Sequence, residues 1–139
     1  MRHRKHTFKI GRTGSHKRCL IANMLKSLIE HNRIETTLVK AKELKRYADN
    51  VVTLLKKDTL ASKRNIKSLL MIRFNTLTPK EKRAAKKGDF SAYNTDRKLQ
   101  KNLEELKTRF PERNGGYTRI IKKDFRVGDG APKCIIEYI

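Results

Sequence analysis

The first acidic residue of this chain is Glu30, and the residues before it hold eight Lys or Arg side chains and three histidines. Residues 1–14 are polar and contain two glycines. A segment of this kind cannot bury enough apolar surface to offset the entropy lost on ordering. We therefore predict an extended basic arm over residues 1–14, which repels itself unless an extended polyanion such as nucleic acid lies along it.

The rest of the chain is basic as well. Thirty-five Lys and Arg against 14 Asp and Glu give a net charge of +21 on 139 residues. Such a balance is typical of nucleic-acid-binding proteins. The longest apolar runs, such as residues 69–72, are far too short to span a membrane, and no apolar stretch of a secretory signal follows the basic start. We expect a cytoplasmic protein with no membrane partner.

Neither metal nor enzyme chemistry is indicated. Cys19 and Cys134 form no C-x-x-C pair, and His16 with Cys19 would supply only two of the four ligands that zinc normally takes. Residues 128–130 are too short for a dinucleotide fingerprint, and there is no phosphate-binding loop or nucleophile elbow. We expect no metal, no cofactor, no small-molecule substrate and no catalytic residue.

Apolar spacing predicts four amphipathic helices and three strands. The helices are expected over residues 15–31, with Ser15 as N-cap, and over residues 39–57, 59–74 and 99–110. The strands are expected over residues 33–38, 117–123 and 133–139, the last two as an antiparallel pair with the first as a candidate neighbour. The predicted class is α+β, with a small, about three-stranded sheet packed against the helices in a single domain of residues 15–139.

Residues 75–94 differ from their surroundings. Thr78, Pro79 and Glu81 are typical of a helix start with a capping box. Five of the eight residues from 80 to 87 are Lys or Arg, and no apolar stripe accompanies them. We interpret the segment as a basic insertion that is either solvated or turned toward RNA.

Three groups of residues are candidates for RNA binding. Arginine forks and lysines bind phosphates, glycines allow close backbone approach, and rings stack on unpaired bases. The competing interpretations are solvated disorder for the arm, a solvated charged face for residues 40–46 and a plain hairpin turn for residues 113–119. The candidates are Arg2, His3, Arg4, Lys5, Lys9, Arg12, His16, Lys17 and Arg18; Lys40, Lys42, Lys45 and Arg46; and Arg113, Gly115, Gly116, Tyr117, Thr118 and Arg119.

Four sets of residues follow one another along the chain: residues 1–5, 11–12 and 15–18; residues 34–46; residues 109–110 and 113–120; and residues 126–132. Their sequences and order resemble the bacterial large-subunit ribosomal protein seventeen family. Segment 75–94 is longer than in most members, and Lys133 stands where the family usually has Met. The resemblance implies a structural protein of the large ribosomal subunit that binds large-subunit ribosomal RNA, inserts its arm into it and touches neighbouring ribosomal proteins.

These observations lead to one expected function and two alternatives. The expected function is to bind and stabilise folded ribosomal RNA in the cytoplasmic ribosome, mainly through its backbone. The first alternative is a DNA-binding architectural protein with the arm in a minor groove. The second is a small RNA-processing enzyme that uses the arm histidines.

Overall fold

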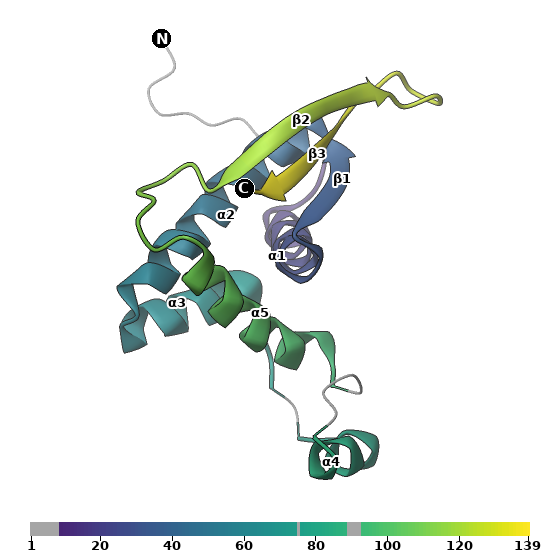
Figure 1. The fold of residues 1–139 in the computed structure, drawn as a ribbon. Helices are drawn as coiled ribbons and strands as arrows, with labels where there is room; N and C mark the ends of the chain where they lie inside the picture. The colour runs from purple at the N-terminus through teal and green to yellow at the C-terminus, as the bar shows by residue number, and fades with distance from the viewer. Residues whose placement is uncertain (1–8, 75, 89–92) are drawn as a thin grey trace.

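The computed structural model describes residues 9–74, 76–88 and 93–139, so the predictions for residues 1–8 lie outside the described part. Five helices and three strands follow one another along it (Figure 1). They are α1 (Gly14–His31), β1 (Arg33–Thr37), α2 (Leu38–Lys57), α3 (Leu60–Leu70), α4 (Pro79–Lys86), α5 (Thr95–Arg109), β2 (Thr118–Phe125) and β3 (Pro132–Tyr138). The predicted α+β class is confirmed.

The three strands form one antiparallel sheet in the order β1-β3-β2. Ile136 in the central strand lies opposite Ile34 of β1 and Ile120 of β2. A register shift between Lys122 and Phe125 interrupts the β2–β3 ladder near its far end. The predicted antiparallel pairing of the late strands, with the early strand as a neighbour, is therefore confirmed.

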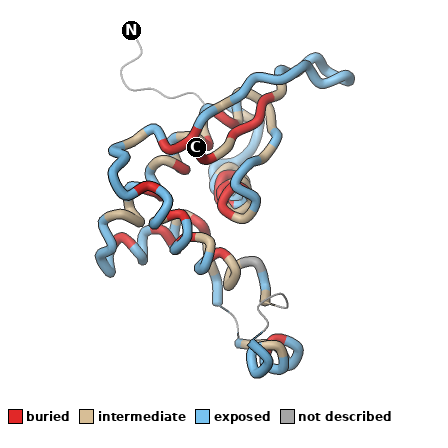
Figure 2. The backbone as a smooth tube through the Cα atoms, in the orientation of Figure 1, coloured by how far each residue is buried: buried red, intermediate tan, exposed pale blue. Residues whose placement is uncertain are grey.

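The core lies where the sheet meets α1 and α2 and continues between α2, α3 and α5 (Figures 1 and 2). Strand alternation turns every second residue of β3 toward the helices. The helices contribute leucines and valines at spacings of three and four residues. The side chains with no exposed surface include Leu25, Leu28, Leu44, Val51, Val52, Leu70, Leu99, Cys134 and Ile136.

Two predicted helix ends are corrected. The N-cap of the first helix is Thr13 and not Ser15, so the helix already includes Gly14. The helix predicted over residues 59–74 ends at Leu70, because Met71 adopts a left-handed backbone conformation with φ of 51°. The amides of Met71 and Ile72 donate to the carbonyl groups of Ser68 and Lys67, which closes the helix end.

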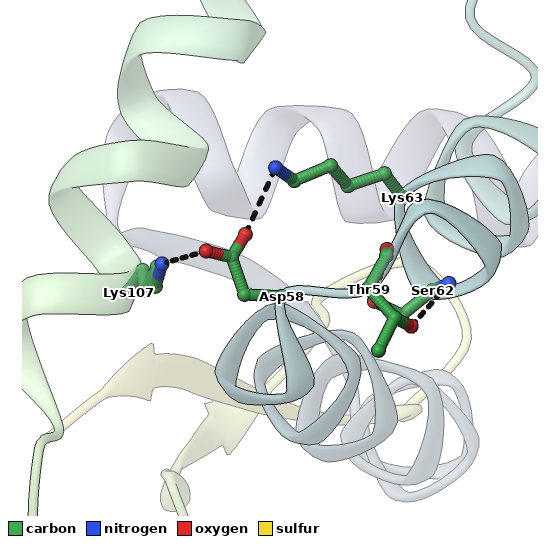
Figure 3. Close-up of polar contacts among 5 residues, drawn as sticks. All are labelled: Asp58, Thr59, Ser62, Lys63 and Lys107. Atoms are coloured by element: carbon green, nitrogen blue, oxygen red, sulfur yellow. Dashed lines mark hydrogen bonds and ion pairs between the residues drawn. The ribbon is translucent and has the colours of Figure 1, made fainter.

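Asp58 joins three helices at the turn between α2 and α3 (Figure 3). Its carboxylate accepts a hydrogen bond from Lys107 Nζ of α5 at 2.8 Å and contacts Lys63 Nζ of α3 at 3.0 Å. The next residue, Thr59, caps α3 by accepting from the Ser62 amide. The Lys107 hydrogen bond, followed by that of Lys63, lowers the pKa of Asp58 to about 2.

Replacing Asp58 with Asn should make the free energy of unfolding less dependent on pH in the acidic range. Because the folded-state pKa lies below the unfolded value of about 3.9, the stabilisation is present above pH 4 and is lost as the pH falls through about 2. Asn tolerates the left-handed backbone of residue 58, with φ of 49°. Urea unfolding at several pH values should show that the variant is less stable than wild type at pH 6 and that the difference shrinks toward pH 2.

The matched control is Glu104→Gln, which removes an exposed α5 carboxylate that makes no ion pair with a described residue. A pH dependence that is the same in both variants and wild type would contradict the role of Asp58.

Candidate nucleic-acid interface

The amino-terminal ends of α1 and α2 differ from those of the other helices. Neither Thr13 nor Thr37 makes a side-chain cap hydrogen bond within the described part of the chain. The first turns of α1 and α2 also hold no acidic residue, a feature that α3 shares. The other three helices have side-chain caps from Thr59, Thr78 and Asn94. Unpaired amides and the positive end of the helix dipole favour an anion, so these two ends are suited to phosphate.

Glu43 holds the two helix ends side by side. Its carboxylate lies 3.9 Å from Lys17 Nζ in the first turn of α1 and 3.7 Å from an Arg46 guanidinium nitrogen of α2. The chain arrives at this arrangement because β1 leads back from the far end of α1 and α2 starts directly after it. Described members of two of the three predicted groups, Lys17 and Arg46, therefore meet at Glu43.

We call this cluster the basic end. Glu43 pairs with two of its cations, whereas Arg18, Lys40, Lys42 and Lys45 form no ion pair with a carboxylate of the described residues. Arg12, His16, Arg18, Lys42 and Arg46 are exposed, and the other members are half-buried. Its members are Arg12, His16, Lys17, Arg18, Lys40, Lys42, Lys45 and Arg46.

The Gly-Gly loop lies elsewhere. Lys56, in the last turn of α2, donates to the Arg113 carbonyl oxygen at 2.7 Å. This contact fixes the loop at the opposite end of α2 from Lys40, about 24 Å along a helix that rises 1.5 Å per residue. The exposed Arg113 and the glycines at 115 and 116 thus form a separate surface and not an extension of the basic end.

The structure buries the side chains of Tyr117 and Thr118, two of the residues predicted to bind RNA. Tyr117 is 3% exposed, and its ring centroid lies 5.3 Å from that of Phe110. Thr118 is 2% exposed, and its hydroxyl donates to Asp49 Oδ1 at 3.0 Å. Both side chains connect the start of β2 to the helices and offer no exposed group to the candidate interface.

The remaining candidates have different surroundings. Arg119 is exposed, and its Nε donates to Glu137 Oε1 at 2.6 Å across the β2–β3 pair. The Glu137 carboxylate partly neutralises the Arg119 guanidinium, so Arg119 attracts a phosphate less strongly. Lys9 is exposed next to Ile10, which packs against the core. Arg2, His3, Arg4 and Lys5 lie outside the described residues.

The cysteines and the acidic side chains do not gather into a metal site in the described chain. Within residues 9–74, 76–88 and 93–139, no group of three or more His, Cys, Asp or Glu side chains is placed to hold a metal ion. None of the helices over the same residues is long and apolar enough to cross a bilayer. Cys19 is exposed and Cys134 is buried, each as a free thiol.

Two positioning residues are not recognisable from the sequence. Lys56 fixes the Gly-Gly loop through a carbonyl oxygen 57 residues away, and Asp49 fixes Thr118 across 69 residues. No local sequence pattern indicates a contact between residues so far apart in the chain. The lack of an acidic residue in the first turns of α1 and α2 is visible in the sequence, but α3 shares this feature, so it does not by itself distinguish the two helix ends.

Comparisons with known proteins give consistent matches. The family model for ribosomal protein L17 matches residues 20–139. The chain is 59% identical to the large ribosomal subunit protein bL17 of Chlamydia trachomatis serovar L2 and 60% identical to that of Chlamydia muridarum. Identity to the bL17 protein of Protochlamydia amoebophila is 59%. Each alignment spans 140 residues and covers 100% of this chain and 99% of the relative.

Proposed function

Because this chain belongs to the ribosomal protein L17 family, we propose that it is a structural constituent of the large ribosomal subunit that binds and stabilises large-subunit ribosomal RNA. The names of its relatives support the large subunit as the place of assembly. Neighbouring large-subunit proteins are the expected protein partners. The proposed role is structural, without catalysis.

The basic end carries the proposal for RNA. It combines the amino-terminal ends of two helices with cationic side chains, of which Lys17 and Arg46 pair with the Glu43 carboxylate. In isolation this arrangement is electrostatically unfavourable, since the helix dipoles place positive charge where the lysines already stand. A phosphate backbone between α1 and α2 would relieve the repulsion and release condensed counterions.

Recognition is proposed to depend mainly on the shape and backbone of the RNA. The chain offers 35 Lys and Arg side chains, which bind phosphates, and the members of the basic end extend from helix ends, which also bind phosphates. Folded RNA presents its backbone along a wide, shallow minor groove and at junctions. The arm continues from Arg12 at the basic end and is proposed to enter the RNA from there.

The test compares binding of the full chain to large-subunit ribosomal RNA and to duplex DNA of equal length over a range of salt concentrations. We expect tighter binding to the RNA and co-sedimentation with large subunits at moderate salt. The fourfold variant Arg18→Gln, Lys40→Gln, Lys42→Gln and Lys45→Gln should reduce the slope of log K against log salt by about 0.7–0.9 for each phosphate that is no longer neutralised.

The matched control removes four charges from lysines that already pair with carboxylates, by changing Lys63, Lys107, Lys123 and Lys133 to Gln. Its slope should fall less than that of the basic-end variant. Equal or tighter binding to duplex DNA would contradict the RNA proposal and favour the architectural alternative.

A further inference from the structure

Residues 76–88, which we call the α4 lobe, stand apart from the rest of the molecule. Figure 1 shows α4 beyond the amino-terminal end of α5, away from the sheet and from α2. Figure 2 shows that most of the residues along α4 are exposed. The core cluster of buried hydrophobic residues includes no residue of the lobe. The lobe therefore has a position in the fold that hydrophobic packing does not explain.

Two carboxylates hold the chain segments that precede and follow the lobe. Asp96, in the first turn of α5, accepts from the Arg73 amide at 3.1 Å and from Lys26 Nζ at 2.6 Å. Glu81 of α4 accepts from the Asn94 amide at 3.1 Å. Since Asn94 is the N-cap of α5, both ends of the projecting segment are attached to the same helix end.

Glu81 turns its charge inward. It is 5% exposed, and its Oε2 accepts from the Thr78 amide at 2.8 Å and from the Thr78 hydroxyl at 2.9 Å. The hydrogen bond from the Thr78 amide lowers the pKa of Glu81 most, followed by the bonds from the Thr78 hydroxyl and the Asn94 amide. The one acidic side chain of α4 is thus used to hold the lobe together and is withdrawn from its surface.

The cations occupy the opposite side of the helix. At 3.6 residues per turn they fall within about half of the circumference, and Glu81 and Ala84 lie on the other half. In the described residues none of them forms an ion pair with a carboxylate, unlike Lys26, Lys63 or Lys107 elsewhere. The cationic face consists of Lys80, Lys82, Arg83, Lys86 and Lys87.

We propose that the α4 lobe is a second RNA-binding element, which grips the phosphodiester backbone of a ribosomal RNA segment separate from the one at the basic end. The inference rests on the proposed function and adds a site to it. Five cations over about 12 Å of helix match a densely charged linear polyanion. Acidic protein is the poorer fit, because protein interfaces have an apolar or aromatic centre, and this face has none.

The lobe is expected to recognise mainly the charge and backbone of the RNA, since four of its five cations are lysines and one is an arginine. Its cationic face carries no Asn, Gln or aromatic side chain that could read or stack on a base. Its contribution should therefore depend mainly on the phosphates within its reach and only weakly on the base sequence of the RNA segment.

The experiment uses the full-length chain and large-subunit ribosomal RNA over a salt series. The lobe variant changes Lys80, Lys82, Arg83, Lys86 and Lys87 to Gln, which spares Thr78, Glu81 and Asn94. The control variant changes Lys63, Lys101, Lys107, Lys123 and Lys133 to Gln, which removes the same charge from lysines in ion pairs. Thermal unfolding, followed by circular dichroism, verifies that both variants are folded.

If the lobe binds RNA, the salt slope of its variant falls by about 0.7–0.9 for every phosphate that the lobe neutralises in wild type, or by about 2 or more for three phosphates. The control should retain a slope closer to that of wild type. A lobe variant whose slope equals that of wild type or of the control overturns the inference. If wild type itself does not bind the RNA, the proposed function fails, and this outcome is distinct because it appears before any variant is compared.

Discussion

Deleting residues 2–9 should leave the domain folded and remove a large part of its salt-dependent RNA binding. The deletion takes away Arg2, Arg4, Lys5 and Lys9 and spares Ile10, which packs against the core. If each of the four cations meets a phosphate, the slope of log K against log salt falls by about 2.8–3.6. When the salt is raised from about 50 to about 200 mM, the RNA affinity of both proteins falls. The fall for wild type should be larger than that for the truncated protein by a factor of about 50–150.

A full-length variant separates charge from chain length in this experiment. Changing Arg2, Arg4, Lys5 and Lys9 to Gln keeps the arm and removes only its charge. We expect it to follow the truncation in RNA titrations, because backbone neutralisation is the proposed mechanism. A truncated protein that retains the wild-type slope would show that the arm does not touch phosphate.

Replacing Gly115 and Gly116 with Val should destabilise the fold by several kcal/mol. Their φ angles are 128° and 60°, and a β-branched residue with positive φ costs about 1–3 kcal/mol. Open space surrounds both positions, so the expected cost arises from the backbone and not from side-chain collisions. The turn leads directly into Tyr117, which is 3% exposed, so a distorted turn should also displace the Tyr117 ring from the core.

Asn114→Val is the control for the glycine variant. Residue 114 precedes the two glycines and has no positive φ, so Val is tolerated there at a cost within about 0.5 kcal/mol, as for most surface changes. Urea unfolding of the three proteins measures the difference. A double glycine variant that is as stable as Asn114→Val would mean that the turn relaxes into another conformation at no cost in stability.

The helices were predictable where a single side of each faces the core. Leu25, Leu28 and Ile29 repeat at helical spacing in α1, and all three are buried. The same pattern misled the prediction for α3, since Ile72 and Phe74 continue the apolar spacing past the end of the helix. The left-handed conformation of Met71 ends the helix there, and an apolar residue type does not reveal that conformation in advance.

The candidate site was predictable as a set of residues and not as an arrangement. Charge alone selected Lys17, Arg18 and Lys42, but the sequence does not state that α1 and α2 start side by side around Glu43. The burial of Tyr117 and Thr118 was not predictable from the sequence, because burial is a tertiary property. Thr118 donates to Asp49, which lies 69 residues away in the chain. The residues next to Thr118 in the sequence therefore do not indicate this contact.

The order of the strands determines when the sheet can form during synthesis. β1 and β2 both pair with β3 and not with each other, and β3 is the last of the three to be made. While the chain grows, α1 and α2 can already begin to pack, as amino-terminal segments usually fold first. Until residues 132–138 emerge, both strands keep unpaired edges, which invite pairing with other chains. We therefore expect a nascent chain interrupted before residue 132 to have two strands without their common partner and to aggregate more readily than the complete chain.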